Sequence, residues 1–199
     1  MAKKPENASE IEAALLARRK AVFEAEVLMH LNSAFTLARY LTRRGDIAED
    51  LVQEALLRAY RSFDETRSSN VRAWLLTIVR NCFLTWKVRN RDESALRDFG
   101  GTGASLEQDV GEAQEYETPE SILIRHEEDR TMRSLIEGLQ HPFREVLVLR
   151  DIEDMSYREI ADITGVPMGT VMSRLARARK MFAEAWKGSQ MRSPKEMLR

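Results

Sequence analysis

The sequence of 199 residues holds a single cysteine, Cys82, together with only nine glycines and five prolines. One cysteine excludes an internal disulfide and a thiolate metal cluster. No run of about 18 apolar residues is present, so the sequence predicts no membrane insertion. The N-terminus lacks the apolar segment of a secretory signal, and we expect the protein in the cytoplasm. Because no alternating strand pattern recurs and helix-forming residues dominate, the sequence predicts an all-α fold.

The signatures of the common enzyme classes are also missing. His30, His126 and His141 lie far apart, without the Cys or carboxylate spacing of a metal site. The stretch "GGTG" lacks both the Lys-Ser/Thr pair of a Walker phosphate loop and a preceding strand. We therefore expect no enzyme: no catalytic residue, no metal and no cofactor.

The net charge of −1 is distributed unevenly along the chain. Residues 1–91 hold 16 Lys and Arg against 11 Asp and Glu, and residues 131–199 hold 12 against 9. Residues 92–130 between them hold 3 against 12. Two mildly basic blocks around an acidic stretch indicate two domains that face nucleic acid, joined by a linker. Charge alone leaves open that solvated helix faces simply differ in charge.

Apolar spacing in the first block predicts three helices. The first covers residues 10–44 and is broken at Gly45 in "RRGD". Asp46 then has the position of an N-cap, with Glu49 completing a capping box before the second helix, which ends at Phe63.

Asn70 can cap the third helix, which runs to residue 91. The periodicity lapses over residues 92–119, too long for an ordinary loop, so this stretch reads as a flexible acidic linker. Residues 120–150 return to helix with a break near "QHP". The apolar stripe expected on the third helix comprises Val71, Trp74, Leu75, Ile78, Cys82 and Trp86.

Residues 156–180, "SYREIADITGVPMGTVMSRLARARK", have the helix start and stop signals of a helix-turn-helix. Ser156 and Glu159 form a capping box, Gly165 allows the turn, and Pro167 suits the start of the second helix. On that helix the expected inward face is Val171, Leu175, Ala178 and Phe182. The expected outward face is Thr170, Ser173, Arg174, Arg177 and Lys180. Short polar groups followed by cations are typical of a helix that reads DNA, whereas a basic surface helix of an ordinary bundle is the alternative.

These stretches resemble a known family. "HPFREVLVLRDIEDMSYREIADITGVPMGTVMSRLARARKMF" is similar to region 4 of the group IV, or extracytoplasmic-function, bacterial sigma-70 factors. "GDIAEDLVQEALLRAYRSF" resembles their region 2.2, and "NVRAWLLTIVRNCFLTWKVRNR" their regions 2.3 to 2.4. The resemblance implies two small helical domains. They divide the chain into a helical N-terminal extension (1–22), a sigma-2 domain (23–91), the acidic linker (92–119), a sigma-4 domain (120–185) and a C-terminal tail (186–199).

The resemblance implies an alternative sigma factor that binds core RNA polymerase and directs it to promoters, commonly for a stress response under an anti-sigma factor. Sigma-2 would bind the polymerase and the melted −10 element, and sigma-4 the duplex −35 element. Core-binding positions carried over are Asp50, Gln53 and Glu54. Those for the −10 element are Ser69, Asn70, Arg72, Arg80 and Asn81. The outward face named above is carried over to the −35 element.

Two other functions stay open on the residues alone. The first is a stand-alone helix-turn-helix repressor or activator, in which residues 1–119 sense a ligand or dimerise. The second is a pure interaction module, against which the cations of the recognition helix argue.

Overall fold

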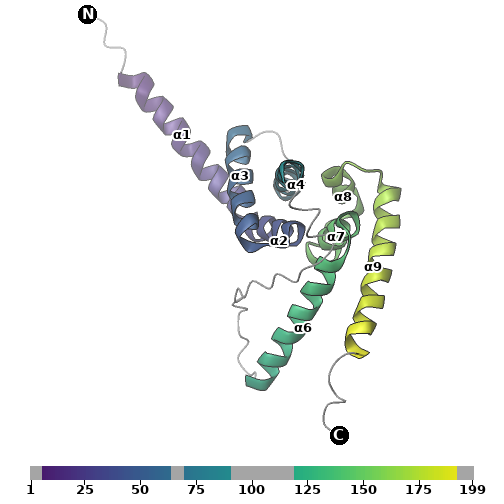
Figure 1. The fold of residues 1–199 in the computed structure, drawn as a ribbon. Helices are drawn as coiled ribbons and strands as arrows, with labels where there is room; N and C mark the ends of the chain where they lie inside the picture. The colour runs from purple at the N-terminus through teal and green to yellow at the C-terminus, as the bar shows by residue number, and fades with distance from the viewer. Residues whose placement is uncertain (1–5, 64–69, 91–118, 192–199) are drawn as a thin grey trace, which may run out of the picture.

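The computed structural model describes residues 6–63, 70–90 and 119–191, and every regular element in them is helical. In Figure 1, α1 projects from one end of the molecule, while α6 and α9 lie side by side at the opposite end. None of the helices in the described ranges is long and apolar enough to cross a membrane. The all-α prediction is confirmed.

The N-terminal part comprises α1 (Glu6–Val27), a 3₁₀ turn η1 (Leu28–His30), α2 (Leu31–Thr42), α3 (Gly45–Ser62) and α4 (Val71–Arg89). The C-terminal part comprises α6 (Pro119–Gly138), α7 (His141–Leu147), a π-helical turn η2 (Val148–Ile152), α8 (Tyr157–Thr164) and α9 (Met168–Met191).

The helix predicted over residues 10–44 is two helices, because η1 divides α1 from α2. The C-terminal half of α1 is fixed to the end of α3. Phe23 packs edge-on against Tyr60 and Phe63, with ring centroids 5.1 and 5.3 Å apart. The Arg19 guanidinium donates hydrogen bonds to the carbonyls of Tyr60 (2.8 Å) and Phe63 (3.2 Å). These carbonyls lie at the end of α3, where the helix leaves its own acceptors unpaired.

The corner between α2 and α3 differs from the prediction. Arg43, not Gly45, takes the left-handed conformation (φ 61°), and its N–H donates to the Arg39 carbonyl at 2.9 Å. Gly45 is the first, buried residue of α3, and the N-cap is Arg44, without a side-chain capping bond. Asp46 therefore lies inside the helix and pairs with Arg44. The predicted capping box of Asp46 and Glu49 is wrong, since the helix begins one residue before Asp46.

The third predicted helix is α4, and its cap is confirmed: the Asn70 Oδ1 accepts from the Ala73 N–H at 2.9 Å. The predicted apolar stripe is only partly correct, because several of its members are half-buried. Helix α4 packs against α2 and α3 and also against α8, so burial extends around it. The buried residues of α4 are Leu75, Leu76, Val79, Cys82 and Phe83.

The cores of the two domains are continuous. A single cluster of buried apolar residues runs from Phe23 in α1 to Ala178 in α9. At the junction, the Phe83 ring of α4 stacks on His141 at the start of α7, with centroids 5.1 Å apart. Arg144 of α7 is buried, and its guanidinium donates to the Leu41 carbonyl of α2 at 3.3 Å. The sequence predicted two domains but not this contact between them.

In the C-terminal domain the break near "QHP" is confirmed between α6 and α7. The chain then widens into η2 and turns at Asp154, whose φ is 47°. The capping box of Ser156 and Glu159 is present at the start of α8, and Gly165 ends α8 in the left-handed conformation (φ 67°). A residue with a side chain is strained at this φ, which explains the glycine.

Candidate nucleic-acid interface

The recognition helix α9 is held by the helix-turn-helix core. Val171, Leu175 and Ala178 are buried, and Phe182 packs against the same cluster, so the predicted inward face is confirmed. Helix α8 supplies Ile160 and Ile163 to this core. The second helix is therefore fixed in rotation about its axis, and its other face is available for contact.

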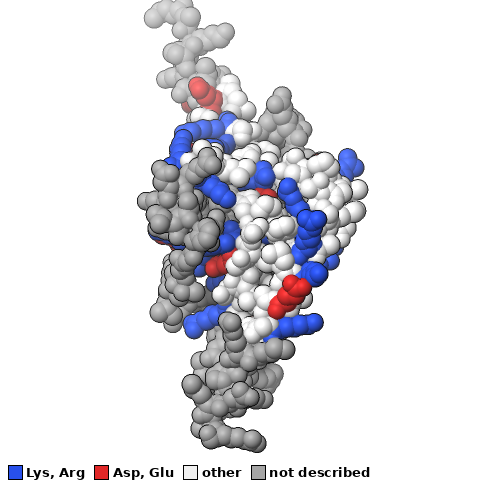
Figure 2. Space-filling model, turned by 45° about the vertical axis from the view of Figure 1, so that its right-hand side comes forward, with Lys and Arg blue, Asp and Glu red and all other residues white. Residues whose placement is uncertain are grey.

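The outward face of α9 is not uniform. Ser173, Arg177 and Lys180 are exposed, whereas Thr170 and Arg174 are half-buried. Arg174 lies three residues from Val171 and four from Ala178, so it stands at the edge of the buried face. Its charge lies near two α7 side chains, where it adds to the burial that lowers the pKa of His141 and opposes the burial that raises the pKa of Glu145. Figure 2 shows Lys and Arg side chains spread over this face of the molecule, with few acidic residues among the described atoms.

The predicted −10 residues lie in a different environment. Asn81 is exposed on α4, and Ser69 lies outside the described residues. Asn70, Arg72 and Arg80, in contrast, each contact an acidic residue of the C-terminal domain.

The three contacts run along the side of α4 that faces α7 and α8. The Arg80 Nε donates to the Glu145 Oε1 at 2.8 Å, with the two side chains 17% and 2% exposed. Arg72 pairs with Glu153, and its Nε also donates to the Ser33 hydroxyl at 3.1 Å.

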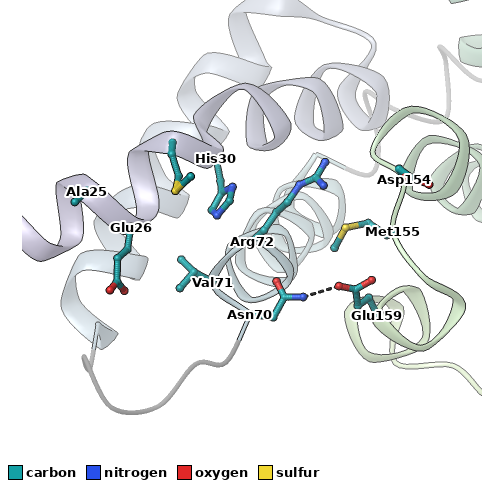
Figure 3. A pocket seen from close by; sticks show the side chains of 10 residues that line it. Ala25, Glu26, His30, Asn70, Val71, Arg72, Asp154, Met155 and Glu159 are labelled. Carbon is teal, nitrogen blue, oxygen red and sulfur yellow. Dashed lines mark hydrogen bonds between the residues drawn. The ribbon is translucent and has the colours of Figure 1, made fainter.

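The third contact is made by Asn70, whose amide nitrogen donates to the carboxylate of Glu159 (Figure 3). We call the side chains of Asn70, Arg72, Arg80, Glu145, Glu153 and Glu159 the interdomain clasp. The sequence did not indicate it: Glu159 was predicted only as a helix cap, and Glu145 and Glu153 were assigned no role.

Two clasp carboxylates differ in their electrostatic environment. Burial raises the pKa of Glu145, and the nearby Arg80 charge only partly opposes this effect. The Ser156 hydroxyl and N–H hydrogen-bond to Glu159 and lower its pKa, with Asn70 and Arg72 adding to the effect. Hydrogen bonds thus favour the charged form of Glu159 at the solvent edge, whereas burial disfavours the charged form of Glu145 and the pairing with Arg80 opposes that effect.

An open pocket of about 470 Å³ lies at the outer end of the clasp. It is lined from α1 and η1 by Glu26, Met29 and His30 and from the other domain by Met155 and Glu159. Figure 3 shows Asn70, Val71 and Arg72, from the start of α4, between these two walls. Solvent therefore reaches the clasp from this side.

The predicted polymerase contact residues Asp50, Gln53 and Glu54 are all exposed on α3. Their spacing of three and four residues places them on one face of the helix. Glu54 accepts a hydrogen bond from the Arg58 Nε at 2.7 Å, one turn further along. This face lies opposite the buried residues Leu51, Val52, Ala55 and Ala59.

Comparison with known proteins matches both halves of the chain. Residues 27–93 match the family described as Sigma-70 region 2, and residues 130–182 match Sigma-70, region 4. The ECF RNA polymerase sigma-E factor of Escherichia coli is 30% identical over 159 residues, covering 79% of this chain and 83% of that protein. The chain belongs to the extracytoplasmic-function class of sigma-70 factors. This membership favours an alternative sigma factor over a stand-alone repressor.

Other relatives of this sigma factor agree. The sigma-E factor of Haemophilus influenzae is 33% identical over 148 residues, covering 73% of this chain and 77% of that protein. The sigma factor RpoE of Bartonella quintana, solved in complex with the anti-sigma factor NepR, has a TM-score of 0.61 and 30% identity. The comparison covers 83% of this chain and 96% of RpoE. CnrH, solved with the cytosolic domain of CnrY, shares the fold, with a TM-score of 0.58 over 85% of this chain and 90% of CnrH.

The junction between the sigma-2 and sigma-4 domains is expected to weaken in acid through His141. Burial, together with the nearby charges of Lys87, Arg144, Arg80 and Arg174, lowers the pKa of this histidine to about 3. Once exposed by unfolding, the imidazole has its usual pKa near 6.5, so the unfolded chain takes up the proton first. The free energy of unfolding therefore falls as the pH drops below about 6.5, by at most about 2 kcal/mol at pH 5 from this group.

Urea unfolding of the intact sigma factor between pH 7.5 and 5 measures this loss. The matched variant His141→Gln keeps a polar side chain without the ionisation, so its loss of stability over the same range should be smaller. Glu145 acts in the opposite direction, because its raised pKa favours the folded state as the pH falls. Equal pH dependence in the two proteins would contradict the assignment to His141.

Proposed function

We propose that this alternative sigma factor binds core RNA polymerase through the α3 face of Asp50, Gln53 and Glu54. It then reads the −35 element with α9 and the melted −10 element with α4 and the loop before it. The observation that carries the proposal is the orientation of α9. Its apolar side is fixed in a capped helix-turn-helix, and its exposed side holds Ser173, Arg177 and Lys180. A helix of this kind offers short donors for base edges and cations for phosphates.

The partners follow from the proposed function. Promoter DNA is held as a duplex at −35 and as single strands at −10, and bond formation belongs to the polymerase, so the chain itself is not an enzyme. An anti-sigma factor is a further partner, by analogy with RpoE, which was solved in complex with the anti-sigma factor NepR. The sigma factor acts in the cytoplasm, where the polymerase and the chromosome are.

Transcription with purified core polymerase and a library of randomised promoters tests the proposal. The expected result is initiation only when the sigma factor is present, and enrichment of two short elements spaced like −35 and −10. A protein that binds core but selects no promoter, or one that binds DNA tightly without core and never initiates, would contradict it.

Two substitutions on α9 are expected to separate base reading from phosphate binding. Arg174 lies near the N-terminal end of α9, and Lys180 is almost two turns further along. An Arg to guanine contact discriminates against a wrong base by about 1–3 kcal/mol. Arg174→Ala should therefore relax the preference at one or two −35 positions. A phosphate contact serves any sequence, so Lys180→Ala should weaken all promoters alike and lower the salt slope by about one unit.

The randomised −35 library, measured at several salt concentrations, distinguishes these outcomes. Lys187→Ala is the matched control, since Lys187 is also exposed on α9 but lies seven residues beyond Lys180. It should leave both preference and affinity unchanged. If Arg174→Ala lowers activity equally on every sequence, Arg174 holds phosphate and the assigned reading face is wrong.

A further inference from the structure

We propose that the interdomain clasp masks the −10 surface of the free protein, with the carboxylates of sigma-4 occupying the groups that bind single-stranded DNA. The inference rests on the proposed function, because it concerns the regulation of the same surface. It adds that sigma-2 and sigma-4 must separate before the −10 element can bind.

The groups assigned to the −10 element are already paired in this structure. Of the five residues assigned to the −10 element, three belong to the clasp: Asn70, Arg72 and Arg80. Each is paired with a carboxylate from α7, from α8 or from the residue that follows η2, rather than from sigma-2 itself. A carboxylate presents to a guanidinium the same planar pair of anionic oxygens that a phosphate does. The three glutamates thus stand where the nucleic acid backbone would make its contacts.

Two of the clasp glutamates are buried. The side chain of Glu145 is 2% exposed and that of Glu153 is 6% exposed, so the sides of Arg80 and Arg72 that face these glutamates are closed to DNA until the partner is exchanged. Glu153 reaches Arg72 because the π-helical turn η2 and the left-handed Asp154 redirect the chain just there. The chain adopts two uncommon backbone conformations on either side of this glutamate.

The ion pairs of the clasp add little to the stability of the closed arrangement, so the contact can open. Buried ion pairs contribute little net stability, because the desolvation of both charges offsets their attraction. They do select one arrangement of the partners over others when an apolar contact accompanies them. Here the buried apolar cluster that is continuous across both domains and the stacking of Phe83 on His141 supply that contact. Because the open pocket beside Glu159 admits water to one end, the clasp can open from that end.

The test replaces the clasp carboxylates in the full-length protein by isosteric amides, as Glu145→Gln, Glu153→Gln and Glu159→Gln together. Glutamine at 159 can still complete the capping box of α8. The probe is a fluorescent single-stranded DNA of random sequence, and its binding is read by anisotropy without polymerase. We expect at least about tenfold tighter binding than in the wild type, and an increased radius of gyration in X-ray scattering.

Removing three negative charges strengthens DNA binding by itself, so the control carries the same charge change elsewhere. Glu128→Gln, Asp129→Asn and Asp162→Asn alter three exposed acidic residues of the C-terminal domain outside the clasp. This control should bind the probe no more than about twofold tighter and keep the wild-type radius. If the triple variant proves unstable in circular dichroism, the double variant Glu153→Gln with Glu159→Gln replaces it. This variant retains the buried Glu145, so its gain in affinity should be smaller.

The outcomes separate the inference from the proposed function. Variants that stay compact, or that gain no more affinity than the control, overturn the masking role. Variants that expand without gaining affinity also overturn it, because the opened surface then does not bind single strands. Transcription by wild-type sigma factor with core polymerase is scored independently. If the wild type initiates transcription but the clasp variants keep the wild-type DNA affinity and radius, the masking role of the clasp is rejected and the proposed function stands. If the wild type fails to initiate, the proposed function is rejected.

Discussion

The double substitution Asp50→Lys with Glu54→Lys should reduce the affinity for core polymerase by at least about 30-fold while leaving the fold intact. Asp50 and Glu54 are exposed on one face of α3, and Glu54 forms a surface pair with Arg58. Such pairs contribute well under 1 kcal/mol to folding. An interfacial charge that loses its partner costs about 2 kcal/mol or more in binding, and reversal adds repulsion. Titration of labelled core polymerase measures the effect, and circular dichroism reports the fold.

A second double variant controls for the change in net charge. Glu12→Lys with Glu24→Lys alters two exposed residues of α1, and Glu24 forms an i,i+4 pair with Lys20 as Glu54 does with Arg58. This variant should bind core polymerase within about twofold of the wild type. Equal losses in both would mean that total charge, not the α3 face, governs the association.

The largest effect on stability is expected from Leu175→Asp. Leu175 is 2% exposed between Val171 and Ala178 at the centre of the helix-turn-helix core. The change removes a buried side chain, worth about 2–5 kcal/mol, and places a carboxylate in a buried apolar site. Urea unfolding should show a loss of more than about 4 kcal/mol, and binding of a −35 duplex should disappear.

The neighbouring position provides the control for this substitution. Ala176 is exposed on the same helix, so Ala176→Asp introduces the same charge with a cost of less than about 1 kcal/mol from helix propensity. Because the buried cluster is continuous across both domains, Leu175→Asp should also lower the sigma-2 midpoint, measured by Trp74 and Trp86 fluorescence in a Trp186→Phe background that removes the tryptophan of α9. A normal sigma-2 transition in that variant would show that the two domains unfold independently.

The local features that followed from the sequence are those with short-range causes. The cap at Asn70, the capping box of Ser156 and Glu159, and the left-handed Gly165 each depend on residues within four positions of one another. The inward face of α9 followed from helical periodicity for the same reason. The corner at Arg43 did not follow, because the helix was predicted to break at Gly45 and a non-glycine residue, Arg43, ends α2 in the left-handed conformation. Asp46 was predicted to be the N-cap of α3, but the helix begins one residue earlier, at Gly45, and its N-cap is Arg44.

The sequence by itself determined the all-α class, the helix-turn-helix and the resemblance to sigma-70 regions 2 and 4. Only the tertiary structure decided that α4 is covered on two sides, which buries Leu76, Val79 and Phe83 beyond the predicted stripe. It also decided that Arg72 and Arg80 meet Glu153 and Glu145, residues 81 and 65 positions away. Periodicity records which face of a helix is apolar, but not which distant helix covers it. Pairing between distant charges depends on how two domains pack, and no local pattern in the chain encodes that.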